Sequence, residues 1–125
     1  MLLDTSAWIE LFKESEKNRR VLEVLGGGGC YTSVVSIAEI ANWARRYGKD
    51  VALLTAIVER VSTVIKTDAA IAILAGEINY ERKRHSRGNK WGMIDSIVLA
   101  TAHSIRETVL TCDKDFADLP NAEII

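Results

Sequence analysis

The sequence predicts an α/β fold, a single domain in which a short parallel sheet of four to five strands is flanked by helices on both faces. Short apolar segments such as Leu2-Leu3 and Val109–Thr111 have the length and composition of buried strands. Stretches with apolar residues at helical spacing lie between them, and strands that alternate with helices form parallel sheets. A chain of 125 residues suits one core, so we treat residues 1–125 as one domain.

The apolar pattern and the capping residues predict each element in order. The predicted strands are residues 2–3, 30–32, 63–65 and 109–111, with a last edge strand at residues 124–125. The predicted helices are residues 6–12, capped by Ser6; residues 18–25; a helix that Ser33 or Ser36 caps and that ends near residue 47; residues 51–61; a long helix that Thr67 or Asp68 caps; and residues 94–105.

The four consecutive glycines from Gly26 to Gly29 predict the end of the second helix. Glycines in a row cannot hold a helix, so this stretch is expected to be a turn. No Lys-Ser/Thr pair follows it and no helix is predicted to start on it, which argues against a phosphate-binding loop.

Composition narrows the class of protein without naming a partner. The formal net charge of -1 gives no preference for a polyanion or a polycation. No apolar run approaches the roughly 20 residues that span a bilayer, and Met1 is followed at once by apolar residues, which argues against a signal peptide. We therefore expect a soluble, cytoplasmic protein with no membrane contact. Cys30 and Cys112 lack metal-type spacing and are expected to be reduced, small buried residues.

Four acidic residues fall where a predicted strand ends or a predicted helix begins. They are Asp4, Glu39, Asp95 and Asp113. The carboxyl ends of parallel strands meet at one edge of a sheet, where α/β proteins bind ligands. Carboxylates brought together repel one another, and a hard divalent cation with oxygen ligands relieves that repulsion. The pattern predicts a Mg²⁺ or Mn²⁺ site, and since no histidine belongs to the set, zinc is disfavoured.

Each acidic residue also has a local explanation that needs no shared site. Asp95 could favour the start of a helix through the helix dipole. Glu39 could face solvent, and Asp113 could be a turn residue. Because all four fall at the same predicted edge of the sheet, we favour one common site over separate local roles.

Four segments resemble the signature segments of PIN-domain ribonucleases, and most closely those of the VapC-type toxins of prokaryotic toxin–antitoxin pairs. They are Asp4-Thr5-Ser6-Ala7-Trp8, Ser36-x-x-Glu39, the stretch from Asp95 to Ala102, and Thr111-x-Asp113-x-Asp115-Phe116. The segments keep the family's order and spacing over nearly the entire chain. The resemblance implies a metal-dependent endoribonuclease that hydrolyses RNA phosphodiester bonds, forms a homodimer and is blocked by a small antitoxin protein.

The resemblance also implies roles for individual residues. The catalytic and metal-holding set that it implies is Asp4, Glu39, Asp95 and Asp113. Ser6 and Thr111 stand where the family often has a hydroxyl that helps the site. Asp115 is either an accessory carboxylate or a residue that caps the following turn.

A run of basic residues closes the long helix and enters the loop after it. Its members are Arg82, Lys83, Arg84, Arg87 and Lys90, with His85 among them. A basic strip beside an acidic metal site suits RNA held over the ion, so we expect its arginines and Lys90 to bind RNA. The alternative is a solvated helix end, where cations complement the helix dipole.

The three tryptophans have different expected surroundings. Trp8 lies on an apolar stripe and is expected in the core. Trp91 either stacks on an unpaired base or packs at the hinge of a loop. Trp43 lies near the exposed side of its helix beside Tyr47, which predicts a homodimer or antitoxin contact through the early helices.

Two other classes of function stay open from the residues alone. The chain could be a catalytically inactive PIN-like module that binds RNA or protein, although four mutually repelling carboxylates count against a pure binder. It could also be a phosphatase or receiver-type domain with a phosphorylated Asp. Such a domain needs a partner lysine near a later strand, and the spacing of Lys114 fits poorly.

Overall fold

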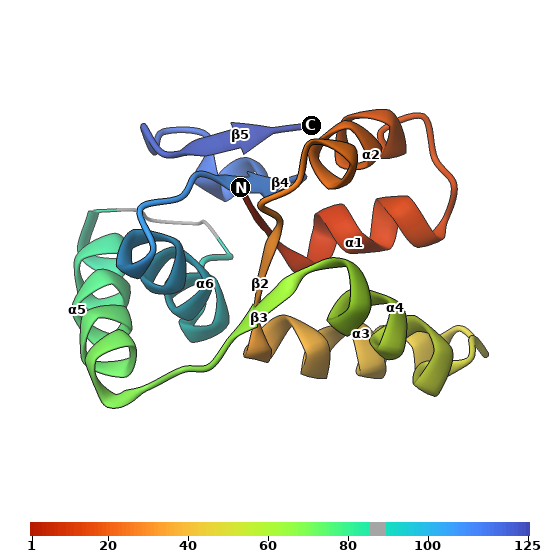
Figure 1. The fold of residues 1–125 in the computed structure, drawn as a ribbon. Coiled ribbons are helices and arrows are strands. Elements are labelled where there is room, and N and C mark those ends of the chain that lie inside the picture. The colour runs from red at the N-terminus through yellow and green to blue at the C-terminus, as the bar shows by residue number, and fades with distance from the viewer. Residues whose placement is uncertain (86–89) are drawn as a thin grey trace.

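The computed structural model describes residues 1–85 and 90–125, which contain one five-stranded parallel sheet in the order β3-β2-β1-β4-β5 (Figure 1). The strands are β1 (Leu2–Leu3), β2 (Tyr31–Ser33), β3 (Thr63–Ile65), β4 (Val109–Thr111) and β5 (Ala122–Ile124). Each lies at or next to its predicted place, and the predicted fold class is confirmed.

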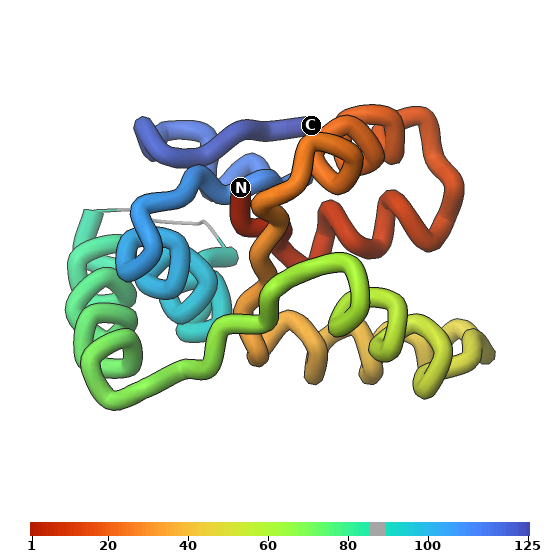
Figure 2. Tube along the Cα trace, in the orientation of Figure 1, coloured from red at the N-terminus to blue at the C-terminus, as the bar shows by residue number. Residues whose placement is uncertain are grey.

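Helices connect the strands and cover both faces of the sheet. They are α1 (Thr5–Phe12), α2 (Asn18–Gly27), α3 (Val34–Arg46), α4 (Val51–Val61), α5 (Ala69–His85), α6 (Met93–Ser104) and the short 3-10 helix η1 (Lys114–Phe116). Helices α1 to α4 lie on one side and α5 and α6 on the other (Figures 1 and 2). The chain moves outward from β1 to β3 and then returns past β1 to β4, and right-handed crossovers put the returning helices on the opposite face. Of the helices described here, none is long and apolar enough to cross a bilayer.

The two central strands supply side chains to both faces, because successive residues of a strand point in opposite directions. Leu3 and Leu110 belong to the buried cluster under α1 to α4, whereas Leu2 and Val109 belong to the cluster under α6. A strand of only two residues, β1, thus contributes to both cores.

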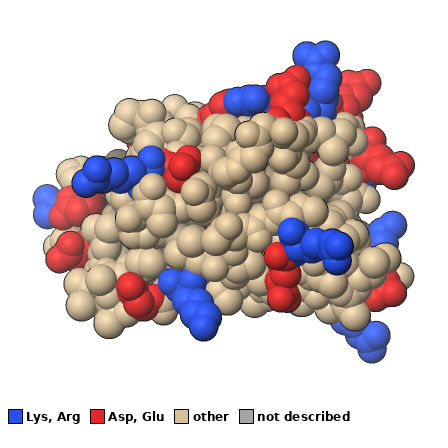
Figure 3. All heavy atoms as spheres, viewed as in Figure 1, with Lys and Arg blue, Asp and Glu red and all other residues tan. Residues whose placement is uncertain are grey.

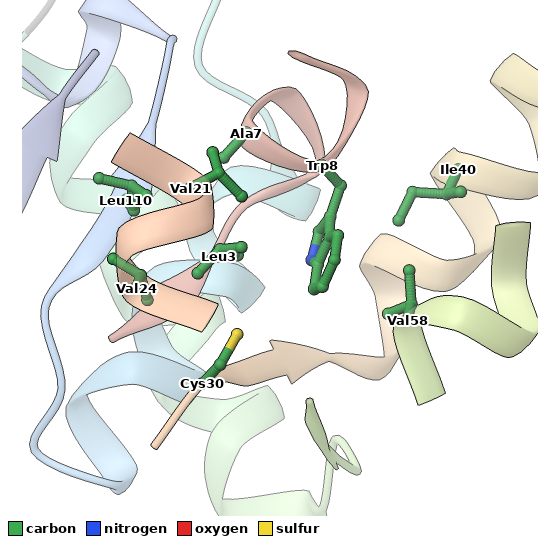
Figure 4. Close-up of a cluster of buried hydrophobic side chains, with 9 residues drawn as sticks. All are labelled: Leu3, Ala7, Trp8, Val21, Val24, Cys30, Ile40, Val58 and Leu110. Carbon is green, nitrogen blue, oxygen red and sulfur yellow. The ribbon is translucent and has the colours of Figure 1, made fainter. Parts of the chain in front are cut away.

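Trp8 is at the centre of the first cluster, as predicted. Its side chain is fully buried and reaches from α1 toward Ile40 of α3 and Val58 of α4 (Figure 4). Its indole Nε1 donates to Thr32 Oγ1 at 3.2 Å. This contact satisfies the buried polar end of the ring and holds the start of α1 against β2.

The start of α1 differs from the prediction. The helix begins at Thr5, so Ser6 lies inside it and the predicted Ser6 cap is wrong. Asp4 occupies the N-cap position, but its side chain makes no capping hydrogen bond. Asp68, one of two predicted caps of α5, does cap it by accepting from the Ile71 amide at 2.8 Å.

The cysteines are both free thiols. Cys30 is buried near Trp8, as predicted, and burial raises the pKa of its thiol to about 11. Cys112 is only partly buried, so the prediction of a buried residue is wrong there. It follows β4, where the chain leaves the sheet and enters the edge described below.

The glycine stretch ends α2 later than predicted. Gly26 and Gly27 are still helical, and the helix stops at Gly28, whose φ is 75° and ψ is 171°. Residues with a side chain rarely adopt that conformation. A shorter turn, Gly28-Gly29, therefore leads into β2.

Gly28→Ala should lower the free energy of unfolding by about 1–3 kcal/mol, because alanine is strained in that backbone conformation. No atom lies within 4 Å of an added Cβ at either Gly28 or Gly26, so crowding plays no part. The matched control Gly26→Ala, inside α2, should stabilise by up to about 1 kcal/mol. Urea unfolding of both variants checks this. Equal effects at the two positions would contradict the backbone explanation.

Candidate active site

The neighbouring strands β1 and β4 form the switch point at the carboxyl edge of the sheet. The connections that follow these neighbouring strands run in opposite directions along the sheet, and such a switch point is where open α/β sheets bind ligands. Asp4 follows β1, and Asp113 comes two residues after β4. The Asp4 amide donates to Leu110 O at 3.0 Å, which ties the end of β1 to β4 at this point.

Asp4 is the most enclosed of the four acidic residues, with 7% of its surface exposed. Its Oδ2 accepts from Ser6 Oγ at 2.9 Å and from Thr111 Oγ1 at 2.8 Å. The two hydroxyls lie 3.0 Å apart, and each also accepts a backbone amide: Cys112 N for Ser6 and Asp113 N for Thr111. Both hydroxyl bonds end on Oδ2, so among the described contacts Oδ1 is the oxygen left for a ligand.

Glu39 approaches the same place from α3. Its Oε1 accepts from Thr5 Oγ1 at 2.6 Å. Burial raises the pKa of Glu39, the Thr5 bond opposes that shift, and the negative charge of Asp4 adds to it. Glu39 is therefore half-buried at the site rather than facing solvent.

Thr5 is a residue that sequence reasoning missed. Its two neighbours, Asp4 and Ser6, were both singled out, and Thr5 stands in the same signature segment. The only available signal was that a buried hydroxyl in the first turn of a helix needs a partner. That partner is Glu39, 34 positions away in the sequence.

Asp95 is the third residue of α6. Its Oδ2 accepts from the Gly92 amide at 2.7 Å. Asp95 therefore does have a local role at the start of α6, in addition to its place near the other carboxylates. Burial raises the pKa of Asp95 to about 6, the Gly92 amide opposes the shift, and repulsion from the three other carboxylates adds to it. Those three are Asp4, Asp113 and Glu39.

Asp113 both caps the short helix η1 and lies at the carboxyl edge of the sheet. Its Oδ1 accepts from the Asp115 amide at 2.8 Å and so caps η1. Its own amide donates to Thr111 Oγ1, the hydroxyl that also bonds Asp4. The structure thus brings the carboxylates of Asp4, Glu39 and Asp113 near enough to Asp95 to raise its pKa, and we call these four residues the acidic site.

The acidic site fits a hard divalent ion by the chemistry of its donors. All four groups are carboxylates, and their mutual repulsion at partly buried positions favours a bound cation. Within residues 1–85 and 90–125, no three acidic, histidine or cysteine side chains stand close enough to hold an ion directly. Mg²⁺ keeps several waters and usually takes only one or two protein carboxylates, so the wider spacing suits ligation partly through water.

Asp115 supports a turn rather than the acidic site. Its Oδ2 accepts from the Lys90 amide at 2.9 Å, which closes the segment before α6. This contact is not the expected cap of the following turn, because the residue that caps η1 is Asp113.

The members of the basic run differ in exposure, so they do not form one exposed surface. Arg82 pairs with Asp118 at 2.7 Å, only 14% of its side chain is exposed, and its guanidinium lies 4.4 Å from the Trp91 ring centroid. Arg82 is thus engaged inside the protein, unlike the exposed RNA ligand that the sequence predicts. Arg84 and Lys90 are exposed, and Arg87 lies outside the described residues. On the face drawn in Figure 3, basic and acidic side chains are interspersed around the rim.

The structure shows the surroundings of Trp91, Trp43 and His103. Trp91 is 1% exposed, packs on Phe116 and donates to Ser96 Oγ, so base stacking is wrong and packing is correct. Trp43 lies against Tyr47, which is 60% exposed. His103, on α6, is exposed.

Comparison with known proteins places the fold in a family. The PIN domain model matches residues 1–122. The chain therefore belongs to the PIN domain family. No curated protein sequence matches it.

Solved structures resemble the chain over almost its whole length. A toxin–antitoxin complex from Klebsiella pneumoniae contains a chain 25% identical, with a TM-score of 0.78 over 98% of this chain and 94% of that one. VapBC2 from Rickettsia felis, bound to a promoter DNA fragment, gives 17% identity and a TM-score of 0.77 over 99% and 96%. The sarcin-ricin loop cleaving toxin VapC20 from Mycobacterium tuberculosis gives 18% and 0.74 over 98% and 97%. These last two show the shared fold alone.

Thr5→Val should raise the pKa of Glu39 further, because the hydroxyl that stabilises its ionised form is lost. Affinity for Mn²⁺ should fall about 10- to 100-fold, as for other partners that orient a ligand. Carboxyl ¹³C titration and calorimetry measure the two effects. Thr5→Ser keeps the hydroxyl and should match the wild type; an unchanged Glu39 titration in Thr5→Val would refute the role.

Asp95 should make the metal-free protein less stable as pH rises. Its folded pKa of about 6 exceeds the unfolded value of about 3.9, so its contribution is present below pH ~4 and lost as pH passes ~6. Asp95→Asn removes this loss and keeps an acceptor for Gly92. The difference in unfolding free energy between variant and wild type should grow by about 1–2 kcal/mol from pH 4 to 7, allowing for solvent screening. A difference independent of pH would contradict the shift.

Proposed function

We propose that this PIN domain is a metal-dependent endoribonuclease that hydrolyses RNA phosphodiester bonds with Mg²⁺ or Mn²⁺. The observation that carries the proposal is the repulsion that Asp4, Glu39 and Asp113 exert on the half-buried Asp95. Four carboxylates close to one another destabilise a fold, so their presence together favours a functional role over a structural one. Proteins of the PIN family are nucleases, which agrees with a hydrolytic role.

The proposed division of labour follows from the contacts of each side chain. Asp4, Glu39, Asp95 and Asp113 hold the ion. The chemistry that such an ion supplies is a water of lowered pKa and shielding of the phosphate charge. Ser6 and Thr111 fix Oδ2 of Asp4 and so direct its other oxygen to the ion.

Fixed carboxylates matter because hydrolysis needs the attacking water and the phosphate held in line. Thr5 fixes one oxygen of Glu39, and the Gly92 amide fixes one oxygen of Asp95. In each case one carboxylate oxygen is bonded to the protein and the group cannot rotate freely. Arg84, Lys90 and Arg87 are the basic residues that we propose contact the RNA backbone.

We further propose that the enzyme is the toxin of a toxin–antitoxin pair in the cytoplasm. The support is the 25% identical chain of the Klebsiella pneumoniae toxin–antitoxin complex, which matches over nearly the full length of both chains. A small antitoxin is then the protein partner. The exposed Tyr47 beside Trp43 is the surface that we propose for a homodimer or antitoxin contact.

A catalytically inactive binding module is the second candidate, and one observation favours it. No three potential ligands among the described residues are close enough to hold an ion directly. If the carboxylates do not close around an added ion, the chain would bind RNA or protein without cutting. The cleavage experiment described next decides between the nuclease and the binding module.

Asp4→Asn should reduce Mn²⁺-dependent cleavage of a single-stranded RNA by about 100-fold or more, because the most enclosed carboxylate of the site loses its charge. EDTA should abolish wild-type cleavage, and Mn²⁺ should restore it. Gel assays of labelled RNA give the rates.

The control for this experiment is Glu59→Gln, which removes an exposed carboxylate on α4 and should cleave like the wild type. Cleavage that survives Asp4→Asn points to contamination or a different site. No cleavage by the wild type, with no Mn²⁺ uptake by calorimetry, favours the binding module.

A further inference from the structure

Arg82 joins three parts of the chain next to the acidic site. It stands near the end of α5, and its guanidinium makes a two-pronged contact with the Asp118 carboxylate, at 2.7 Å and 3.0 Å. The same group donates to the Asp115 carbonyl and covers the Trp91 ring at 4.4 Å. We call Arg82, Trp91, Asp115 and Asp118 the Arg82 network.

One branch of the network leads to Asp95. Trp91 is buried under the guanidinium and donates from Nε1 to Ser96 Oγ at 2.7 Å. Ser96 Oγ has two acceptors for its one proton, the Gly92 carbonyl at 3.3 Å and Asn79 Oδ1 at 3.4 Å. The Gly92 amide is the group that holds Asp95 at 2.7 Å. These contacts connect the Trp91 ring to the turn at Gly92, whose amide bonds Asp95.

The second branch leads to Asp113. Arg82 holds the backbone of Asp115, whose amide donates to Asp113 Oδ1 at 2.8 Å. The Asp115 carboxylate also accepts from the Lys90 amide, so η1 and the turn before α6 are tied to each other. Phe116 packs on Trp91 with the ring centroids 4.7 Å apart, which joins the two branches through their apolar parts.

We propose that Arg82 is a positioning residue, which fixes Asp95 and Asp113 relative to each other through the Trp91 turn and η1 and does not itself contact RNA. The proposal rests on the proposed nuclease function and deepens it. An arginine is needed because its planar fork bonds a carboxylate with two donors and also stacks on an aromatic ring, which a lysine cannot do.

The internal contacts separate this role from an RNA-binding one. The charge of Arg82 is matched by Asp118, which is 69% exposed and lies on the solvent side of the pair. An arriving phosphate would have to displace that carboxylate. Arg84, two positions further on, is exposed and touches only the Tyr80 ring among the described contacts, at 5.9 Å.

The test compares four single variants of the full chain. Arg82→Met keeps the aliphatic stem but loses the fork, and Arg82→Lys keeps the charge. Asp118→Asn weakens the anchor while leaving the arginine and its charge. Arg84→Met removes a neighbouring exposed charge. Thermal unfolding of each establishes that it is folded at the assay temperature.

The kinetic result expected is a loss of kcat in Arg82→Met by about 10- to 100-fold, because small displacements of reacting groups cost that much. KM should be nearly unchanged. Arg82→Lys should rescue little, and Asp118→Asn should lower kcat in the same sense. Arg84→Met should instead raise KM. If Arg82 bound RNA directly, Arg82→Met would raise KM and Asp118→Asn, by freeing the arginine, would lower it.

A second readout needs no activity. The Gly92 amide proton, bonded to Asp95, should move upfield in the NMR spectrum of Arg82→Met and Asp118→Asn and exchange faster with solvent, but not in Arg84→Met. Mn²⁺ affinity measured by calorimetry should fall in the same two variants.

These outcomes keep the two proposals apart. A wild type that does not cleave RNA overturns the nuclease proposal, while a Gly92 shift and weaker Mn²⁺ binding in Arg82→Met still support the positioning role at the acidic site. An unchanged Gly92 resonance in Arg82→Met, with unchanged kcat or unchanged Mn²⁺ affinity, overturns the positioning role whatever the wild type does.

Discussion

The gathering of negative charge at the carboxyl edge of the sheet is the constraint on which the rest of the site depends. Burial and the charges of three neighbours raise the pKa of Asp95 to about 6, which shows that they oppose its ionisation. Repulsion of this kind would push side chains outward into solvent unless something held them. Each carboxylate is in fact held by a hydrogen bond from a hydroxyl or a backbone amide. The donors lower the cost of the arrangement but bring no positive charge, so the repulsion among the carboxylates remains.

The hydrogen-bond donors that hold the four carboxylates are of two kinds. Asp4 and Glu39 receive side-chain hydroxyls, from Ser6, Thr111 and Thr5. Asp95 and Asp113 receive backbone amides at the starts of α6 and η1. The hydroxyls are set by β1, β4 and the first turn of α1, which belong to the rigid centre of the sheet. The amides lie in turns, and turns keep their shape only when other contacts brace them. This difference explains why the Arg82 network is on the amide side.

Much of this arrangement follows from the sequence, and the exceptions have physical reasons. Asp4 and Asp113 could be placed because short apolar strands are recognisable and the carboxyl ends of parallel strands meet at one edge. Thr5 and Arg82 could not. The direction of Thr5 depends on the N-cap of α1 being Asp4, two residues before the predicted cap Ser6. The charge of Arg82 looked available because its neighbours in sequence are basic, whereas its partner Asp118 is 36 positions away. Local charge counts contain no information about such a partner.

The same reasoning applies to Trp91. The sequence left two surroundings open for this residue, and the fold shows which one it has. A tryptophan beside a basic run and an acidic residue has the local composition of a stacking platform for bases. Its burial is decided by Phe116 and Ser96, residues that enter from η1 and α6. With both the ring face and the indole N–H engaged inside the protein, the residue acts on the acidic site through the Gly92 turn instead of through a ligand. Arg82 and Trp91, which look like ligand contacts in the sequence, are thus engaged inside the protein next to the carboxylates, whereas Arg84 and Lys90 are exposed.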